Sequence, residues 1–371
     1  MPKSTRRSKP KIKTRKSSKI KRRSVKKRSG KYRLGVQNLA GGVQDINGFI
    51  RGNIDATIAD LKQYILNTQN IPVNKQRLIK TNDKGYEVLD DARKISSYVF
   101  SDDTIHMFVD NVPGTFIRKF GGSGRGDGQF SSPDGICVSN DEIYVADTGN
   151  NRVQVFDLEG NFVRKFGMGN LDGPSGICEA SGEIYVSSTG QASGHGKHCV
   201  QVYDLEGNFV RKFGEKGDSD GQFYMPKGIC ANDDIYVADR NRVQVFDLEG
   251  NFVRKFETGV NSGGIDVSNG EVYVVKINHF IEVFDLQGRY IRKIGKWGRR
   301  DGELNSPAYI CVSNSEIYVS DKGNNRVQVF NLQGKFIRKF GMGNLDGPSG
   351  ICVSNGQVYV ADYTGIKVFD V

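Results

Sequence analysis

Histidine and cysteine come together in one segment of this chain, His195-Gly196-Lys197-His198-Cys199. Imidazoles and thiolates are ligands for zinc, so this spacing could supply two or three ligands to a metal ion. The surrounding sequence is rich in glycine and serine, however, which is typical of a solvated loop. We therefore predict no metal and no cofactor, and no Ser/His/Asp order, phosphate-binding loop or acid–base pair indicates catalysis.

Aspartate and arginine recur together around three polar turns. Such residues could form a charged binding rim, or each aspartate could cap its turn and pair with the arginine inside the fold. We favour the internal pair, because every repeat that keeps the turn also keeps both residues. The three pairs are Asp147 with Arg152, Asp239 with Arg242, and Asp321 with Arg326.

A basic loop, Lys296-Trp297-Gly298-Arg299-Arg300, contains the only tryptophan of the chain. Tryptophan and arginine are the usual anchors of protein interfaces, and they also suit stacking on unpaired bases. Arg125 occupies the corresponding place in an earlier repeat, near the position of Arg299. We predict an interaction site formed by Arg125, Lys296, Trp297, Arg299 and Arg300; the alternative is an ordinary exposed loop.

The positive charge of the chain is concentrated at its N-terminus. The whole chain of 371 residues carries +11, but residues 1–30 hold 15 Lys and Arg without one Asp or Glu, and residues 31–371 carry −4. Blocks of like charge repel each other and stay disordered. We expect this tail to bind nucleic acid or another polyanion, or to serve as an import signal; the alternative is a tail that only aids solubility. Its densest clusters are Lys21, Arg22, Arg23 and Lys26, Lys27, Arg28.

The elements that must position these residues belong to a repeat. The pattern aromatic-[Ile/Val]-Arg-Lys-[Phe/Ile] occurs six times, at steps of 46, 47, 43, 38 and 46 residues. In the first repeat it ends a series of four short apolar runs separated by Gly, Asn and Asp turns, which indicates four antiparallel strands. The arginines of the six copies are Arg118, Arg164, Arg211, Arg254, Arg292 and Arg338.

The array begins with a fourth strand, at Phe116, and ends after a third strand, at Val371. A closed ring accounts for this phase, because residues 116–120 would then complete the sheet begun by the last three strands. Closure also removes the exposed edges that an open stack would leave. We therefore predict a six-bladed β-propeller over residues 115–371.

The motifs Pro-x-Gly-Ile, Ile-Tyr-Val-Ala-Asp, Asn-Arg-Val-Gln-Val-Phe and Gly-x-Phe-x-Arg-Lys-Phe-Gly resemble the NHL repeat family over the whole array. The resemblance implies an NHL-type propeller like those of tripartite-motif proteins, which bind RNA or protein. The chain has no ring motif, so ligase activity is not implied. Metal-dependent lyases with NHL-like propellers use histidines near the central channel, whereas His195, His198 and His279 do not fall on a predicted innermost strand.

Five cysteines share one repeat position, and Asp266 or Val267 takes that place in the fourth repeat. Facing sheets pack about 10 Å apart, whereas a disulfide needs Cα atoms within about 7 Å. We interpret the cysteines as small buried core residues rather than disulfides or metal ligands. They are Cys137, Cys178, Cys230, Cys311 and Cys352.

Residues 31–110 indicate a small α+β domain with one helix over residues 55–69. The string Ile-Pro-Val-Asn-Lys-Gln-Arg-Leu-Ile at residues 71–79 follows that helix at the distance found in ubiquitin. The resemblance implies a ubiquitin-like β-grasp domain, with a partner-binding patch at Ile79, His106 and Phe108 and with Leu39 as a fourth member. The alternative is a patch that packs against the next domain. No free diglycine end follows, because residues 111–114 form a linker into the repeats, so conjugation to targets is not implied.

These features predict a mainly β protein: a disordered basic tail (1–30), a ubiquitin-like domain (31–110), a linker (111–114) and a six-bladed propeller (115–371). Near-identical repeats suit binding better than catalysis, which needs different groups converging on one point. We predict a non-enzymatic adaptor that holds a protein partner on the propeller and reaches ubiquitin-pathway factors through residues 31–110. The alternative is a nucleic-acid-binding protein that uses the tail and a propeller face. No apolar run approaches the roughly 20 residues that span a bilayer, so we expect no membrane contact. We also expect an intracellular monomer, cytoplasmic or nuclear.

Overall fold

The computed structural model describes residues 35–37, 43–45, 60–61, 76–82, 85–88, 104–109, 113–190, 197–259 and 262–371. The chain divides into two compact units, Met1–Asp110 and Asn111–Val371. The basic tail, Leu39 and His195 lie outside the described residues. Each unit is described by itself below.

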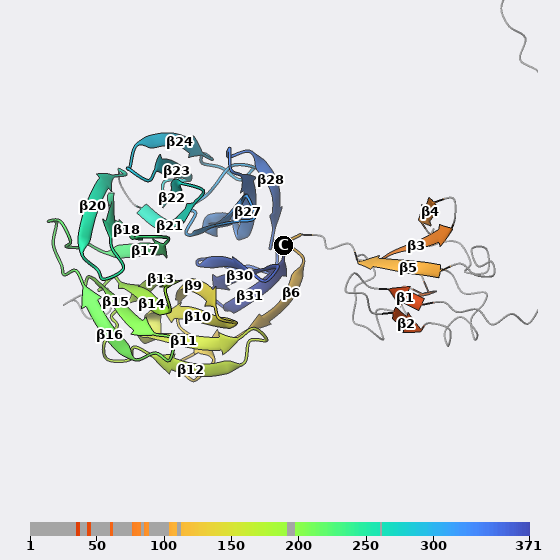
Figure 1. Cartoon of the computed structure of the whole chain (residues 1–371), viewed down its shortest axis with the longest axis horizontal. Helices are drawn as coiled ribbons and strands as arrows, with labels where there is room; N and C mark the ends of the chain where they lie inside the picture. The colour runs from red at the N-terminus through yellow and green to blue at the C-terminus, as the bar shows by residue number, and fades with distance from the viewer. Residues whose placement is uncertain are drawn as a thin grey trace, which may run out of the picture. The chain divides into compact units, whose positions relative to one another are not determined.

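The second unit consists of six four-stranded antiparallel sheets, or blades, arranged around a centre (Figure 1). Blade 1 contains β9 (Pro133–Ser139), β10 (Glu142–Asp147), β11 (Arg152–Asp157) and β12 (Phe162–Phe166). Blade 2 contains β13 (Pro174–Ala180), β14 (Glu183–Ser188), β15 (Cys199–Asp204) and β16 (Phe209–Phe213). Blade 3 contains β17 (Pro226–Ala231), β18 (Ile235–Asp239), β19 (Arg242–Phe246) and β20 (Phe252–Glu257). Blade 4 contains β21 (Ser262–Ser268), β22 (Glu271–Lys276), β23 (Phe280–Asp285) and β24 (Tyr290–Ile294).

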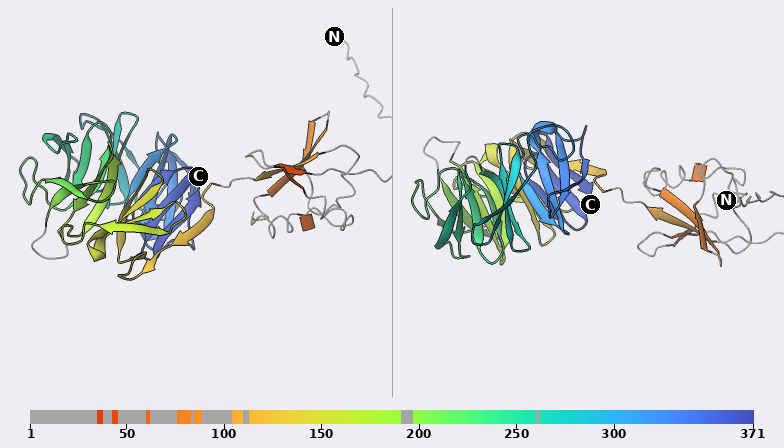
Figure 2. Two further views of the ribbon diagram at one scale, coloured as in Figure 1. Left: turned by 60° about the horizontal axis from the view of Figure 1, so that its bottom comes forward. Right: turned by 90° about the horizontal axis from the view of Figure 1, so that it is seen from above.

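Blade 5 contains β25 (Ile310–Ser313), β26 (Glu316–Asp321), β27 (Arg326–Asn331) and β28 (Phe336–Phe340). Blade 6 combines both ends of the unit: β29 (Ile351–Ser354), β30 (Gln357–Asp362) and β31 (Gly365–Asp370) are completed by β6 (Phe116–Phe120). In this last pair Val368 lies opposite Arg118, and Phe369 lies opposite Phe116. The predicted six-bladed, closed propeller is therefore confirmed, and the side views show the blades stacked around one ring (Figure 2).

The second strand of each blade is apolar on both faces because each blade is covered by two neighbours. Ile143, Tyr144 and Val145 of β10 are all inaccessible to solvent. On one side Tyr144 packs in a cluster that includes Ile177 of blade 2, and on the other side Val145 joins a cluster with Tyr359 of blade 6. Burying each such side chain contributes roughly 1.5–3 kcal/mol, so the core lies between the blades.

The innermost strands come close together at the glycine of the Pro-x-Gly-Ile motif. A Cβ atom on Gly176 would lie 2.3 Å from the carbonyl oxygen of Lys227, and one on Gly350 would lie 2.1 Å from that of Asp134. The Gly350 N–H donates a 2.8 Å hydrogen bond to the same Asp134 oxygen. Glycine is needed here for the approach of two backbones.

The arginine of each outermost strand joins neighbouring blades. Arg164 donates to both carboxylate oxygens of Glu142 in its own blade, at 2.5 and 2.6 Å, and also to the carbonyl of Leu205 in blade 2. This bidentate pair lowers the pKa of Glu142. Arg118 makes the corresponding bond to the Leu158 carbonyl, so the link also crosses the point of closure. The repeated arginines therefore have a structural role.

The first unit has a two-stranded sheet, β1 (Gly35–Gln37) with β2 (Val43–Asp45). A three-stranded sheet has the order β4 (Gly85–Val88), β3 (Gln76–Asn82), β5 (Thr104–Val109). The predicted strand runs at residues 76–79 and 104–109 thus fall within β3 and β5. Of the predicted helix only residues 60 and 61 are described, and both are helical. The ubiquitin-like fold stays a prediction.

Candidate interaction site on the propeller

Three alternate blades are entered by loops of the same design at one end of the propeller. These long loops, residues 121–132, 214–225 and 295–306, lead into blades 1, 3 and 5. All three contain a parallel pairing at the same position: Ser123 with Phe130 in the strands β7 (Gly122–Ser123) and β8 (Gln129–Phe130), Lys216 with Phe223, and Trp297 with Leu304. Ser123, Lys216 and Trp297 therefore occupy equivalent positions, and only blade 5 presents an aromatic ring there.

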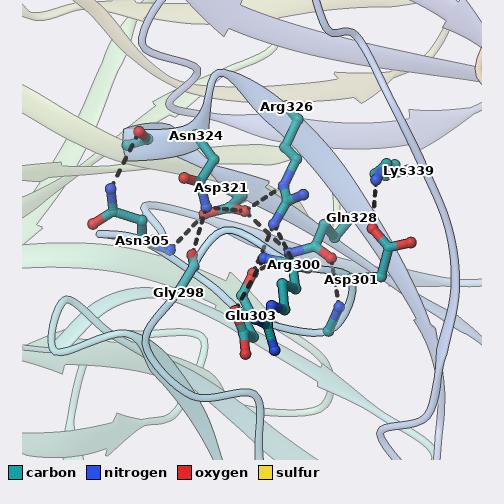
Figure 3. A network of polar contacts seen from close by, with 12 residues as sticks. Gly298, Arg300, Asp301, Glu303, Asn305, Asp321, Asn324, Arg326, Gln328 and Lys339 are labelled. Carbon is teal, nitrogen blue, oxygen red and sulfur yellow. Dashed lines mark hydrogen bonds and ion pairs between the residues drawn. The ribbon is translucent and has the colours of Figure 1, made fainter.

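A buried ion pair holds the long loop of blade 5 in place (Figure 3). Asp321 is inaccessible and accepts hydrogen bonds from the Asn305 N–H and from Arg326 Nε, both at 2.7 Å. Arg326 in turn donates to the carbonyls of Arg300 and Glu303, at 2.9 and 2.8 Å. The loop backbone is thus bonded to a charged pair inside the blade, next to the short 3-10 helix η4 (Lys322–Asn324).

The same pair recurs in blades 1 and 3, where Asp147 lies 2.8 Å from Arg152 and Asp239 lies 3.0 Å from Arg242. All of these side chains are buried. In blade 1 the pair adjoins the corresponding 3-10 helix η3 (Thr148–Asn150). The prediction of an internal pair is confirmed, and a charged rim made from these residues is wrong.

Trp297 stands out from this fixed loop into solvent, with 70% of its surface exposed. Its neighbour Gly298 has φ +153°, and a Cβ there would lie 2.1 Å from the Glu303 carboxylate, so the backbone needs glycine beside the indole. Lys296, Arg299 and Arg300 are exposed as well, and Lys296 Nζ is 3.6 Å from Glu303. These four predicted residues are therefore exposed together on one loop.

Arg125 lies on the equivalent loop of blade 1, so it is separated from Trp297 by blade 6. Two residues between them were missed by the sequence reasoning: Lys322, whose Nζ is 5.0 Å from the ring centroid of Tyr363, and Tyr363 itself. Tyr363 lies where blades 1, 3 and 5 have the Asn-Arg turn, and this interruption was the available signal.

Tyr309 spans the centre of the ring and was also missed by the sequence reasoning. It stands where five repeats have glycine, and its hydroxyl reaches Asp134 Oδ2 at 3.2 Å and Ser175 Oγ at 3.0 Å. Blade 5 lies opposite blade 2 in a ring of six, so this side chain crosses the channel. Burial raises the pKa of Asp134, although hydrogen bonds from Ser175 and Tyr309 partly oppose this.

The five repeated cysteines lie on the innermost strands and are free, as is Cys199. Cys230 is buried as predicted, but the other four are partly accessible. Burial raises the pKa of Cys178, which keeps it a neutral thiol.

The two described histidines of the array accept backbone hydrogen bonds. His198 Nδ1 accepts the Met225 N–H at 3.0 Å, and His279 Nδ1 accepts the Ser306 N–H at 2.9 Å. His198 is buried, and burial lowers its pKa. Among the described residues no group of three or more His, Cys, Asp or Glu could hold a metal ion.

For the predicted patch of the first unit, the structure gives backbone positions. Ile79 of β3 lies opposite His106 of β5, and Phe108 follows His106 by two residues, which is the spacing of one face of a strand. Within the described part of the chain, no helix is long and apolar enough to cross a membrane.

Sequence comparison finds NHL repeats in this array. The family described as "NHL repeat" matches residues 130–156, 304–330 and 345–365, which lie in blades 1, 5 and 6. Blades 1, 5 and 6 therefore contain segments that match the NHL repeat, in agreement with the resemblance seen in the motifs.

Three curated relatives match short parts of the chain. Protein lin-41 of Caenorhabditis elegans is 52% identical over 50 residues, which are 13% of this chain and 4% of that protein. Protein brain tumor of Drosophila melanogaster is 50% identical over 50 residues, 13% of this chain and 5% of that protein. The B-box type zinc finger protein ncl-1 of C. elegans is 53% identical over 45 residues, 12% of this chain and 5% of that protein. The matched segments thus span about one twentieth of each relative.

Solved structures resemble the chain more distantly. A catalytically inactive virginiamycin B lyase from Staphylococcus aureus, with quinupristin, is 16% identical at a TM-score of 0.49 and covers 80% of this chain and 96% of its own. A streptogramin B lyase is 15% identical at a TM-score of 0.47, with 70% and 94% covered.

Proposed function

We propose that this chain is a non-enzymatic adaptor. The end of the propeller that carries the long loops holds a protein partner, and residues 31–110 engage factors of the ubiquitin pathway. The observation that supports the first half most directly is Trp297, a large aromatic side chain that is exposed on a loop fixed from within.

The physical argument is one of preorganisation. An exposed indole gains free energy when a partner removes it from water, and indoles are among the most frequent binding hot spots. The bonds from Asp321 and Arg326 to the loop reduce the entropy that the loop would lose on binding. Lys296, Arg299 and Arg300 are exposed on the same loop and add positive charge to it, which favours a partner surface with acidic groups.

Affinity capture with the full chain as bait tests the propeller half, with bound proteins identified by mass spectrometry. We expect Trp297→Ala to lose the specific partner. Tyr290→Ala is the matched control, because Tyr290 is also a well-exposed aromatic, at 58%, but lies on the outer strand β24. Equal capture by wild type and Trp297→Ala would remove the support for this half.

The ubiquitin half rests on the resemblance of residues 71–79. Ile79→Ala combined with Phe108→Ala should abolish binding of the full chain to a panel of isolated ubiquitin-binding domains, measured by biolayer interferometry. Retained binding by the double variant, or no binding by wild type, would contradict the proposed role of residues 31–110. Neither result would bear on the proposed role of the propeller.

Nucleic-acid binding is the second candidate, and the acid-free tail is the observation that favours it. Residues 115–371 hold 28 Lys and Arg against 32 Asp and Glu, so the tail should carry most of this binding and make it salt-sensitive. A gel-shift comparison of the full chain with residues 31–371 decides. Tight, salt-resistant RNA binding by the tail-less form would instead point to the Trp297 loop. An enzyme ranks third and would be favoured by one metal atom per purified chain.

A further inference from the structure

A pocket lies between the long loop of blade 1 and the turn of blade 6. It has a volume of about 350 Å³, and Arg125, Phe130, Ser131, Ser132 and Tyr363 are among its lining residues. Phe130 is buried, whereas Arg125 and Tyr363 are exposed. The pocket therefore combines a guanidinium group, two hydroxyls and an aromatic wall.

The other long loops show what is missing from this pocket. Ser132, Met225 and Ser306 are equivalent residues, and all three have the left-handed backbone, with φ of +50°, +66° and +46°. In blades 3 and 5 the amide N–H of this residue donates to a histidine of the preceding blade, His198 or His279.

Blade 6 does not supply that histidine to blade 1. Its turn between Asp362 and Gly365 has only the two residues Tyr363 and Thr364, whereas the turn between Lys276 and Phe280 in blade 4 has three. Among the described residues, none accepts a hydrogen bond from the Ser132 N–H. Ser132 is a lining residue of the pocket with a left-handed backbone, and no atom of the described chain accepts its N–H.

The charges around the pocket favour a negative ligand. Arg125 lines it, and Lys322 Nζ lies 5.0 Å from the centroid of the Tyr363 ring. The aspartates of the same region are mostly neutralised: Asp127 lies 2.5 Å from Lys165, Asp362 2.9 Å from Lys367, and Asp147 2.8 Å from Arg152. Asp346, whose carbonyl accepts the Tyr363 N–H, is exposed and is the remaining acidic group nearby.

We propose that this pocket binds one anionic side chain of a protein partner, either a phosphoryl group or a carboxylate. This inference rests on the proposed use of the same propeller end as a protein-binding surface. The Ser132 N–H, the two serine hydroxyls and the Arg125 guanidinium are donors suited to anionic oxygens, and the volume suits a single side chain. Nucleic acid is disfavoured, because residues 115–371 hold 28 Lys and Arg against 32 Asp and Glu and so carry a net negative charge.

Saturation-transfer NMR on the full chain tests the proposal with three small molecules: blocked O-phosphoserine, blocked glutamate and neutral blocked serine. We expect one of the two anions to bind with a Kd of about 1 mM, as suits a ligand of this size, and neutral serine not to bind. Arg125→Gln should weaken the anion roughly tenfold, and Arg125→Lys should restore part of the loss. Arg289→Gln removes the same charge at an exposed turn elsewhere and is the control. The basic tail is present in every sample, so its contribution cancels.

The relative affinity of phosphoserine and glutamate identifies the source of the anion. Absence of binding by both, or equal binding by wild type and Arg125→Gln, overturns the proposal. Arg125-dependent binding of a short uridine oligonucleotide without binding of either amino acid would also overturn it and assign the pocket to nucleic acid. If a protein partner is captured but neither anion binds, only the proposal of the anion pocket is contradicted. If an anion binds but no partner depends on Trp297, the pocket is supported and the proposed partner surface is contradicted.

Discussion

At the residue scale, the side chains that look most reactive in this sequence hold the fold together. Asp321 and Arg326 are buried as a pair that also bonds a loop backbone, and Arg164 joins Glu142 to the carbonyl of the next blade. A buried ion pair that satisfies its remaining donors and acceptors fixes one geometry. The groups left over for binding are those that break the repeat.

Removal of one partner from the buried pair should be costly. Arg326→Ala leaves the Asp321 carboxylate buried without its cation, so we expect a loss of about 3–5 kcal/mol in the free energy of unfolding. Urea unfolding followed by Trp297 fluorescence reports on the loop directly, because this is the only tryptophan. Lys339→Ala, which breaks the exposed pair with Asp301, is the control and should cost less than about 1 kcal/mol. Similar losses for both variants would contradict the role given to the buried pair.

Asp266 should make stability depend on pH. Burial raises the pKa of this carboxyl to about 6, although the N–H groups of Val312 and Val267 partly oppose the shift. The folded chain therefore holds this proton more tightly than the unfolded chain, and the stabilisation from protonation is lost as pH rises from about 4 to about 6. Asp266→Asn cannot ionise, so its stability relative to wild type should increase by about 2–3 kcal/mol between pH 4 and pH 7.

Chemical denaturation at several pH values measures that difference. Asp233→Asn, at an exposed turn, is the matched control and should give a profile parallel to that of wild type. A constant difference between Asp266→Asn and wild type across this range would show that the fold does not raise the pKa of this carboxyl above its value in the unfolded chain.

Individual positions inside the blades could be predicted from the sequence where several repeats share the same residues at the same spacing. The Asp–Arg pairs were predictable because three copies keep the same spacing. Tyr309 and Ser132 were not, because the first acts across the channel and the second through its backbone conformation. The order of residue types along the chain shows neither the distance between two blades nor the φ angle of a residue.

At the element scale, the long loops of blades 3 and 5 are bonded to the turns of blades 2 and 4, whereas the turn of blade 6 gives the loop of blade 1 no such bond among the described residues. The strand order could be predicted from apolar runs and turn residues, since these follow local rules. The pairing of loop with turn could not, because it joins segments about 27 residues apart whose turns differ in length. The alternation of two loop designs around the ring therefore emerged only from the structure.

Loss of a turn histidine should leave a loop amide without its acceptor. In His279→Ala the Ser306 N–H loses its hydrogen bond, so we expect a decrease of about 1–3 kcal/mol in stability. Tyr363→Ala removes the equivalent side chain of blade 6, where no such bond exists among the described residues, and should cost less. Thermal unfolding of the two variants measures the contrast; a larger loss for Tyr363→Ala would show that the hydrogen bond is not the stabilising contact.

At the scale of the whole molecule, the ring is held at its closure by the same contacts that join any two blades. Strand β6 supplies the ladder with β31, the Phe116 contact with Phe369 at 5.7 Å between ring centroids, and the bond from Arg118 to the Leu158 carbonyl. This closure could be predicted from the order of the strands alone, because the array begins with a fourth strand and ends with a third. The geometry of the centre was not, since the channel depends on how six blades converge.

Two truncations test whether β6 is needed for the ring. A chain that begins at Asn111 keeps β6 and should be monomeric, with one cooperative unfolding transition. A chain that begins at Gly122 lacks β6, so β31 becomes an exposed edge and the link to blade 1 disappears. Unpaired edges template association, and we expect this shorter chain to aggregate or to unfold at a temperature lower by several degrees. Light scattering after size-exclusion chromatography and calorimetry compare the two. If both chains remain monomeric with the same transition temperature, the five complete blades are sufficient for a stable fold. Strand β6 would then complete the ring without adding to its stability.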